Sequence, residues 1–492
     1  MDFRLKTFFH ILGLMLCIEA IAMMPSLFYA VYLDEHATAH AFEVCVCTFG
    51  ILGILMNRLI PRSARRMRIR DGYFTMIFIW LICTIAAMFP YYLSGQVDTV
   101  IDAFFEATAS LTTTGASVVQ DRWFTDPLIL WKAVGSWLGG VTFIAYMISI
   151  MPSFSMRSSM LASIETPGAK MANATVKTSD QVKVLYFAYA FLTAAEFILL
   201  WAGSDMNAFE SLVNTLGSVS TAGIFLHPGG IAYYNSFYVE SVVVIFTILA
   251  SINFMLYIKA VQRNFRSIVT NVELKVFLSL IIFGTLIIAA TLYVEGVYDS
   301  AGESLRYALL QTTAFSSTSG FTITDYTGWP SLCKMILFLL LFIGGCTAST
   351  AGGIKVIRFS IMCQLIRRGF YRRIHPRATR AVKLGGTAIS APLVASVTSF
   401  ITLFLGVFLF TAIVLSLQGL DFETTLSASV SLLSTTGSSF GSIGSTGDYS
   451  VFCQPLRLFC SIMMIFGRME LYAALLLFVP EFWNPNRSRK IR

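Results

Sequence analysis

Four short segments of the chain combine serine or threonine with a following glycine. They read TTTG, STAG, STSG and STTG, and their glycines are Gly115, Gly223, Gly320 and Gly437. Glycine lets a chain turn its carbonyl groups toward a common line. Rings of carbonyl oxygens can replace the hydration shell of a cation, and hydroxyl groups add further oxygen ligands. The chemistry that these segments predict is therefore cation coordination without a carboxylate.

The residues predicted to bind the cation are the three that end each segment. Because the segments repeat at intervals of roughly a hundred residues, each should contribute an equivalent set of ligands. The predicted ligands are Thr113, Thr114, Gly115, Thr221, Ala222, Gly223, Thr318, Ser319, Gly320, Thr435, Thr436 and Gly437.

A short amphipathic stretch precedes each segment. The stretches are Val100–Leu111, Ala208–Ser218, Leu305–Ser316 and Phe422–Leu433, all too short to cross a membrane. Backbone can leave a helix at membrane depth only where it is buried in protein or faces water. We therefore expect four re-entrant half-helices whose negative C-terminal ends point at one pore axis. Small-residue clusters also pack membrane helices together, but their fourfold repetition favours a pore.

The surrounding chain has the composition of a membrane protein. Of its 492 residues, 56% are hydrophobic and 13% are charged, whereas about a quarter are charged in soluble domains. About ten apolar stretches are long enough to cross a bilayer as helices. These are Phe8–Leu33, Ala41–Ile60, Gly72–Leu93, Pro127–Met151, Val182–Gly203, Phe237–Ile258, Leu274–Tyr293, Leu332–Phe359, Leu393–Leu417 and Leu456–Val479. The nine cysteines show no metal-ligand spacing.

The charges between these stretches predict the orientation of the chain. Most of the 35 lysines and arginines fall in alternate loops, with dense groups at Lys355–Lys383 and Arg487–Arg492. Acidic residues dominate the other loops. Since basic loops stay in the cytoplasm, we expect both termini there and the half-helices to enter from outside. The net charge of +8 is then a topology signal, and we expect no binding to nucleic acid.

A glycine-rich segment interrupts the long apolar run Leu332–Phe359. It reads GGCTASTAGG and includes Gly344, Gly345, Gly352 and Gly353. Glycine disfavours helix, so the run should break near the middle of the membrane. A phosphate-binding loop would need a G-K-[ST] ending, which is missing. Two interpretations remain: close packing against a neighbouring span or subunit, and a flexible plug below the four loops.

Arg468 lies near the centre of the last apolar stretch, far from either interface. A buried arginine there needs a structural partner, such as loop carbonyls, or a position in the pore below the four loops. Glu470 faces another side of the helix and is a poor partner for it. Glu19, Glu43 and Glu196 also lie within spans. We expect interhelical hydrogen bonds from them, and their roles stay open.

These motifs, with GGCTASTAGGIKVIRF (Gly344–Phe359) and GRME (Gly467–Glu470), resemble the Trk/Ktr/HKT superfamily of potassium transporters. The chain is most similar to the bacterial TrkH-type subunit, including an N-terminal helix pair that KtrB-type relatives lack. The resemblance implies an all-α integral membrane protein with four M1-P-M2 repeats around one pseudo-fourfold pore. It also implies potassium selectivity from the four loop glycines, and gating by the glycine-rich segment and Arg468. The fourth loop, STTGSSFG, departs from the Asn-rich, Pro-containing sequence of close relatives.

The resemblance further implies where the protein works and with what. It predicts a homodimer in the lipid of the bacterial inner membrane and a cytosolic nucleotide-binding gating ring of TrkA type. Potassium would be the transported ion, no covalent cofactor is expected, and nucleotide would bind only to the partner. The predicted units are an N-terminal helix pair at 1–70 and pore repeats at 71–160, 161–270, 271–384 and 385–492.

Two other classes of function are alternatives. A proton- or sodium-coupled cation symporter could use the same fold, but carriers typically show inverted repeats, whereas these repeats enter from one side. A membrane-embedded enzyme would need a convergent catalytic cluster, and the five histidines are dispersed. We therefore expect no enzymatic activity. The sequence does not distinguish channel-like from ion-coupled flux.

Overall fold

The computed structural model describes residues 5–60, 69–119, 124–150, 178–224, 226–227, 229–322, 324–377 and 381–483. The basic group Arg487–Arg492 lies outside the described residues, as does most of two further basic loops, Arg58–Arg70 and Arg157–Lys183, which belong to the same set of alternate loops. The described chain is almost entirely helical. Its only sheet is a hairpin of two strands with two residues each, β1 (Lys383–Leu384) and β2 (Thr387–Ala388).

The helices follow the predicted order of a helical pair and four repeats. The N-terminal pair is α1 (Leu5–Tyr32) and α2 (His36–Leu59). The first repeat holds α3 (Ile69–Leu93), α4 (Val100–Leu111) and α5 (Asp126–Ile150), and the second holds α7 (Thr178–Gly203), α8 (Ala208–Val219), α9 (Phe237–Ser251), α10 (Met255–Val261) and α11 (Phe265–Val269). The third holds α12 (Val272–Val294), α13 (Ala301–Ser316), α14 (Ser331–Ile343) and α15 (Val356–Ile374), and the fourth holds α16 (Ala391–Ser416), α17 (Phe422–Ser434), α18 (Gln454–Arg468), α19 (Tyr472–Leu475) and α20 (Pro480–Trp483). Short 3-10 turns lie at Gly230–Tyr234, Gly444–Thr446, Tyr449–Val451 and Leu476–Phe478.

Two predicted spans are bent rather than straight. Six described helices, α1, α2, α3, α7, α12 and α16, are long and apolar enough to cross a membrane. The expected continuous helix Phe237–Ile258 is wrong, because α9 and α10 meet at an angle of 100°. The expected helix Leu456–Val479 is also wrong, because α18 and α19 meet at 112°. Positive φ angles at Glu470 and Leu471 end the helical backbone there. The break predicted within the run Leu332–Phe359 is confirmed: α14 ends at Ile343 and α15 begins at Val356.

The four half-helices form where the amphipathic stretches predicted them. Each begins at a polar N-cap whose side chain accepts a backbone N–H from the first turn, at Thr99, Asn207, Ser300 and Asp421. Such caps satisfy donors that the helix itself leaves unpaired. The cap at Ser300 also explains why α13 begins before the predicted Leu305.

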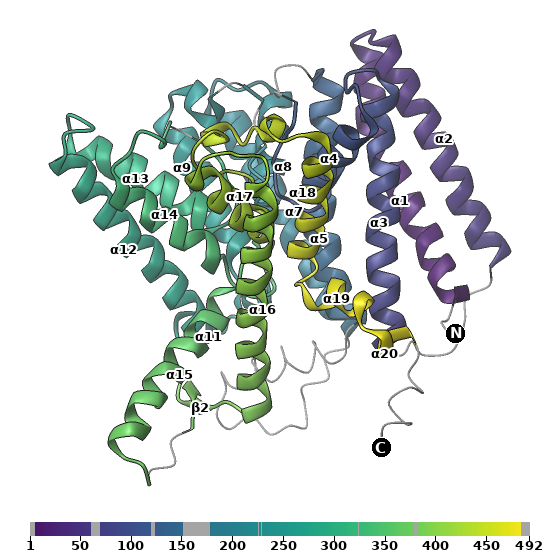
Figure 1. Ribbon diagram of the computed structural model, residues 1–492. Helices are drawn as coiled ribbons and strands as arrows, with labels where there is room; N and C mark the ends of the chain where they lie inside the picture. The colour runs from purple at the N-terminus through teal and green to yellow at the C-terminus, as the bar shows by residue number, and fades with distance from the viewer. Residues whose placement is uncertain are drawn as a thin grey trace.

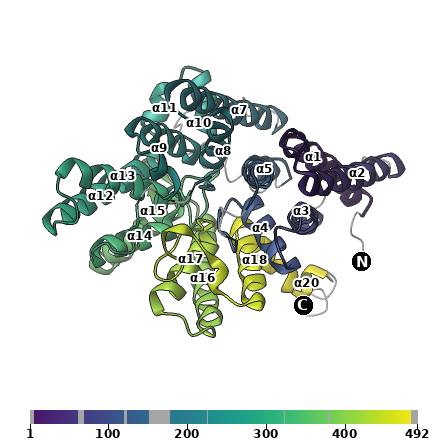
Figure 2. The same cartoon turned by 90° about the horizontal axis from the view of Figure 1, so that it is seen from above.

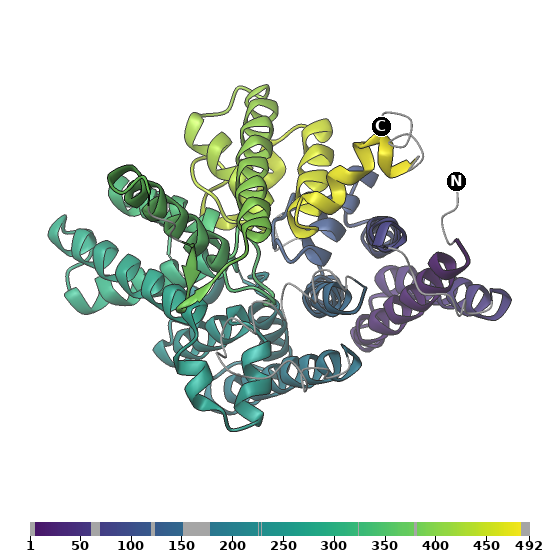
Figure 3. The ribbon, with the colours of Figure 1, turned by 90° about the horizontal axis from the view of Figure 1, so that it is seen from below.

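The four repeats surround a common centre, and the N-terminal pair stands outside them. Seen from above, α4, α8, α13 and α17 lie around the middle of the molecule, while α1 and α2 flank α3 and α5 (Figure 2). In the side view the half-helices occupy one end, and α1 begins and α20 ends at the other (Figure 1). The view from below shows the same arrangement of the repeats around a centre, from the side where α1 begins and α20 ends (Figure 3). All four half-helices therefore enter from the side opposite the termini.

The hydrophobic core joins the repeats behind the half-helices. Its largest buried cluster includes residues from all four repeats. The rings of Phe105 and Tyr449 have centroids 5.7 Å apart, and those of Phe315 and Phe440 are 5.6 Å apart. Because these pairs join the first and third repeats to the fourth, aromatic packing holds neighbouring half-helices and loops together.

Candidate functional site

Each half-helix runs into a loop of the same backbone conformation. The threonine that begins each predicted ligand set has a positive φ: 56° at Thr113, 55° at Thr221, 55° at Thr318 and 53° at Thr435. The glycine two residues later also has a positive φ in all four loops. A β-branched residue rarely adopts this left-handed conformation. Its recurrence at four equivalent positions indicates a backbone shape that the surrounding structure imposes.

The four loops touch one another in a closed ring. A side chain at Gly115 would collide with the carbonyl oxygen of Ala222 in the second loop. In the same way, Gly223 meets the carbonyl of Ser319, Gly320 that of Thr436, and Gly437 that of Thr114. Since the last contact returns to the first loop, the loops surround a single axis. Only glycine fits at these positions, because any Cβ would displace a neighbouring carbonyl.

The backbone N–H groups of the loops bond back to the half-helices. In the first loop, Thr114 and Gly115 donate to the carbonyl of Ala109 at 2.9 and 3.2 Å. The second and third loops repeat this pattern with the carbonyls of Gly217 and Ala314. Within the described chain, no hydrogen-bond donor reaches the carbonyl oxygens of Thr114, Ala222, Ser319 and Thr436. The ring therefore presents oxygens whose hydrogen-bonding capacity is unused.

The electrostatics of the ring suit a positive ion. None of the twelve predicted ligands carries a charge. The C-terminal ends of α4, α8, α13 and α17 lead directly into the loops, so their partial negative charges lie around the axis. Carbonyl and hydroxyl oxygens with this background favour a monovalent cation that sheds its water.

The glycine-rich segment lies against the inner ends of the half-helices. It links α14 to α15, and Gly344, Ala348, Gly353 and Lys355 all have positive φ. The N–H of Gly352 donates to Thr318 Oγ1 at 2.7 Å, and a side chain at Gly352 would strike the carbonyl of Ser434. The segment therefore sits directly beside the ring, on the side toward the termini.

Arg468 reaches this segment from the end of α18. Its Nη1 donates to the carbonyl of Thr350 at 2.7 Å, and its Nη2 to the carbonyl of Gly139 at 3.2 Å. The residue is only 4% exposed. Since Arg468 ends its helix, the guanidinium sits beside a kink rather than in the middle of a straight span. The structure thus brings together Arg468 and the segment that holds Gly344, Gly345, Gly352 and Gly353.

Two further charged residues hold the segment, and the sequence patterns missed them. Lys355 donates to the carbonyls of Ala351 and Cys346 at 2.7 and 3.4 Å. The Glu273 carboxylate accepts hydrogen bonds from the N–H and hydroxyl of Thr347, at 2.6 to 2.9 Å. The available signal for Lys355 was a lysine two residues after the last glycine, inside an apolar run. Glu273 had none, because it reads as an ordinary acidic residue in the first turn of α12.

The other acidic residues of the spans have separate partners. Glu470 pairs with Arg358 at 2.6 Å, as expected of a residue that faces away from Arg468. Glu196 accepts a hydrogen bond from Ser218 of α8 at 2.5 Å. Glu43 is exposed and lies 3.9 Å from His40, and Glu19 is buried between the first helices. None of these carboxylates is in the ring.

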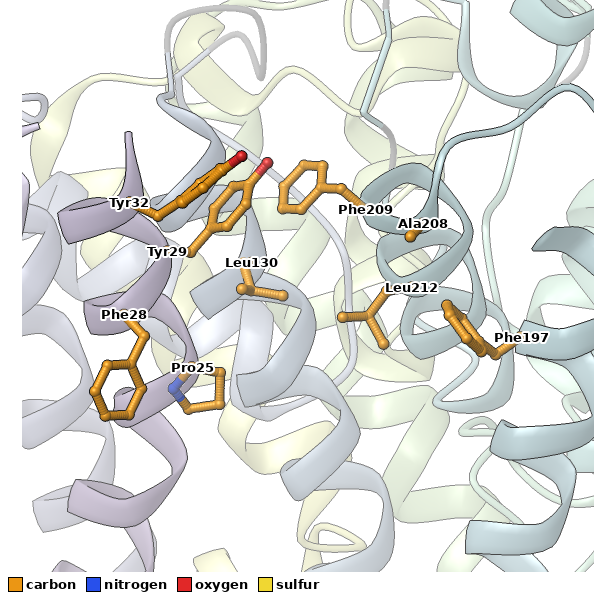
Figure 4. Close-up of a pocket in the computed structure, with 9 residues that line it drawn as sticks. All are labelled: Pro25, Phe28, Tyr29, Tyr32, Leu130, Phe197, Ala208, Phe209 and Leu212. Carbon is orange, nitrogen blue, oxygen red and sulfur yellow. The ribbon is translucent and has the colours of Figure 1, made fainter. Parts of the chain in front are cut away.

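An apolar pocket lies away from the ring, where α1 meets α5, α7 and α8. Pro25, Phe28, Leu130, Phe197 and Leu212 line it (Figure 4). The hydroxyl groups of Tyr29 and Tyr32 point toward the end where Phe209 lies (Figure 4). With an almost wholly apolar lining, this pocket offers no ligands for an ion and is not part of the site.

Fold and site together define a multi-pass membrane protein with four pore-loop repeats around one axis. A family model described as TrkH, a cation transport protein, matches residues 45–486. The chain belongs to this family.

Similar proteins cover the whole chain. It is 28% identical to the Trk system potassium uptake protein TrkG of Escherichia coli K12, over 96% of this chain and 98% of TrkG. It is 27% identical to the Trk system potassium uptake protein TrkH of Vibrio parahaemolyticus, over 98% of this chain and all of that protein. The crystal structure of the potassium transporter TrkH from Vibrio parahaemolyticus superimposes with a TM-score of 0.88 at 25% identity, covering 98% of this chain and 100% of that one.

Proposed function

We propose that this protein takes up potassium across the bacterial inner membrane through the ring of four loops. The observation that carries the proposal is the closed set of contacts between each loop glycine and the next loop's carbonyl. The relatives named as potassium uptake proteins support the choice of ion.

The selectivity filter consists of the twelve loop residues Thr113–Gly115, Thr221–Gly223, Thr318–Gly320 and Thr435–Gly437. Each of the four repeats at 71–160, 161–270, 271–384 and 385–492 contributes one loop. The carbonyl oxygens replace the water around potassium, and the unusual fourth loop closes the ring with the same backbone contacts as the others.

The Gly344–Gly353 segment is the gate, and Arg468 holds it closed. The segment lies across the inner side of the filter, and Arg468 adds positive charge beside the path of a cation. Its residues are small, and hydrogen bonds from Arg468 and Lys355 and to Glu273 hold it in place. Exchange of these few bonds keeps the closed and open positions within about a few kcal/mol of each other, which a partner can overcome.

The regulatory partner is a cytosolic nucleotide-binding ring of TrkA type, and the protein works as a homodimer with both termini in the cytoplasm. The support is the basic end of α15, which projects beyond the other helices on the side of the termini (Figure 1). Arg367, Arg372 and Arg373 are exposed there. Such a group of charges belongs in water and can meet an acidic or polar surface.

The test is rubidium uptake by a bacterium that lacks its own potassium uptake systems. Wild-type protein should restore uptake and growth at low potassium. Gly115→Asp should abolish uptake, since the carboxylate would both displace the Ala222 carbonyl and trap a cation. Wild-type protein that inserts into the membrane but restores no uptake would refute the proposal.

A further inference from the structure

A buried ion pair lies behind the first loop. Glu106 of α4 is fully buried, Lys132 of α5 is 1% exposed, and Lys132 Nζ lies 3.2 Å from Glu106 Oε2. Two charges are kept at such depth only when each compensates the other. When the repeats are aligned on their loop glycines, Asn214, Gln311 and Ala428 hold the position of Glu106. No other repeat has a carboxylate there.

The same carboxylate holds the chain that leaves the first loop. Glu106 Oε1 accepts hydrogen bonds from Ser117 Oγ at 2.6 Å, Val118 N at 2.8 Å and Val119 N at 3.3 Å. Ser117–Val119 is called the outgoing limb below. Hydrogen bonds to a charged acceptor are about twice as strong as neutral ones. Glu106 therefore fixes the outgoing limb to the half-helix that carries the loop.

The outgoing limb also joins the first repeat to the fourth. Ser117 N donates to the carbonyl of Gly447 at 3.2 Å, and Tyr449 N donates to the carbonyl of Ser117 at 2.7 Å. The same two repeats meet in the ring, where Gly437 packs on the carbonyl of Thr114. A shift of the outgoing limb would thus disturb the side of the ring where the first loop meets the fourth.

The second loop is held in a different way. Asn214 donates to the carbonyl of Glu210 in its own half-helix at 2.8 Å and to Tyr234 Oη at 3.3 Å. In the described part of the chain after Gly223, Asn214 accepts no hydrogen bond from the backbone. The carboxylate anchor is therefore a property of the first loop, and the lysine behind it keeps that anchor charged and in place.

We infer that Glu106 is a positioning residue that sets the potassium-over-sodium selectivity of the ring through the outgoing limb, with Lys132 as its counter-charge. This inference rests on the proposed filter. Without the acceptor, the N–H groups of Val118 and Val119 lose their partner, and the Ser117 hydroxyl keeps only the Val119 carbonyl at 2.5 Å. The first loop then relaxes, and the spacing and field of the carbonyl ring no longer favour the larger ion.

Two charge-neutral double variants separate the acceptor from the charge. In Glu106→Gln with Lys132→Met, the amide oxygen still accepts from the outgoing limb. In Glu106→Leu with Lys132→Met, nothing does. The readout is the potassium-to-sodium permeability ratio of the full chain in liposomes. The first variant should stay close to wild type, and the second should lose at least about tenfold, which corresponds to 1.4 kcal/mol.

A milder variant keeps the test decisive if the leucine variant fails to fold. Glu106→Asp retains the charge but withdraws the oxygen from the outgoing limb, so the permeability ratio should fall while the protein still inserts and dimerises like wild type. The control is the partly buried pair Arg306–Glu240, 2.6 Å apart, which joins α13 to α9 and, among the described residues, makes no hydrogen bond to the outgoing limb. Neutralising it with Arg306→Met and Glu240→Gln should leave the ratio unchanged.

The outcomes distinguish this inference from the filter assignment. A wild-type ratio in Glu106→Asp or in the leucine variant, while Gly115→Ser alters it, overturns the role of Glu106 and leaves the filter intact. A wild-type ratio in Gly115→Ser as well overturns the filter itself. An equal loss in the Arg306–Glu240 control would show that any buried pair has this effect, which also contradicts a specific role for Glu106.

Discussion

The loop glycines are the residues on which the ring depends most directly. Each has a positive φ, and each has a neighbouring carbonyl where a side chain would begin. Two independent requirements, backbone conformation and space, thus exclude every other residue type. The geometry explains why glycine stands at all four positions although the residues around it vary.

Gly115→Ser should let sodium through. Its Cβ must push the Ala222 carbonyl away from its place in the ring, which alters the coordination that favours potassium. The check is the potassium-to-sodium permeability ratio in liposomes, which should fall by at least about tenfold. Gly95→Ser is the control, because Gly95 has a positive φ but no atom near its missing side chain. An equal ratio in both variants would argue against the ring as the filter.

Arg468→Ala should raise potassium flux when the regulatory partner is absent. The variant removes hydrogen bonds from a charged donor to the Thr350 and Gly139 carbonyls, each contributing about 1.5–3 kcal/mol. The measurement is rubidium uptake into liposomes that contain only this subunit. Arg468→Lys keeps the charge and should give a smaller rise. Wild-type flux in Arg468→Ala would contradict the gating assignment but not the filter.

Sequence reasoning at the residue scale succeeds where a repeat or an unusual position gives a signal. The loop glycines repeat four times, and an arginine in an apolar stretch stands out. Glu106 and Glu273 give no such signal, because their partners are distant in the sequence: Lys132 lies on another helix, and Thr347 lies in the glycine-rich segment. Only the folded structure brings these groups together.

At the scale of elements, the third repeat differs most from a simple pair of spans. Its second span is broken into α14 and α15 by the gating segment, and α15 continues past the other helices (Figure 1). Ile357 and Ile361 of α15 pack with Leu384 of β1 and Val394 of α16 in a small core of their own. The chain thus runs without a break from the glycine-rich segment, the proposed gate, through α15 to this small core.

Charge reversal at the end of α15 should weaken the complex with a TrkA-type ring. Arg372→Glu with Arg373→Glu changes two exposed residues in the last turn of the helix and touches no buried contact. Co-purification with the ring should fall, while membrane insertion stays unchanged. The control is Glu295→Lys, a charge reversal at the C-terminal end of α12, on the other side of the membrane from the end of α15. It should leave co-purification unchanged. Equal co-purification of both variants would mean that the basic group is only a topological anchor.

The amphipathic pattern predicted the half-helices well, because their caps and apolar faces are local features. The bends after α9 and α18 were not predicted, because apolar residues resume after the polar ones at each bend, Ser251 and Asn253 in the first run and Arg468 and Glu470 in the second. Tertiary contacts impose the first: the Phe254 N–H donates to the Ala348 carbonyl at 3.1 Å, and the Ser251 carbonyl accepts from Cys346. α9 therefore ends where backbone groups of the glycine-rich segment replace the hydrogen bonds that a further helical turn would make.

At the scale of the whole molecule, ion pairs join successive repeats around the ring. Glu240 of α9 pairs with Arg306 of α13, Lys334 of α14 with Glu423 of α17, and Arg457 of α18 with Asp102 of α4. Each joins the second long helix of one repeat to the half-helix of the next. These pairs cover three of the four junctions between repeats, from the second repeat through the third and fourth to the first.

Asp102→Asn should destabilise the protein more than Glu423→Gln. The Asp102 side chain is 12% exposed and meets Arg457 at 2.8 Å, whereas Glu423 is 45% exposed. A partly buried charged hydrogen bond contributes about 1.5–3 kcal/mol, and an exposed pair below about 1 kcal/mol. Thermal unfolding in detergent, with both variants measured side by side, gives the comparison. An equal fall in melting temperature would contradict the larger contribution of the Arg457–Asp102 pair.

The central claim is that potassium crosses the protein inside the ring of four loops. The most direct measurement is the anomalous diffraction of crystals grown in rubidium. Rubidium should give a peak on the axis among the carbonyl oxygens of Thr114, Ala222, Ser319 and Thr436, and the peak should disappear in Gly115→Asp. Rubidium bound elsewhere in the membrane region, with an empty ring, would contradict the account.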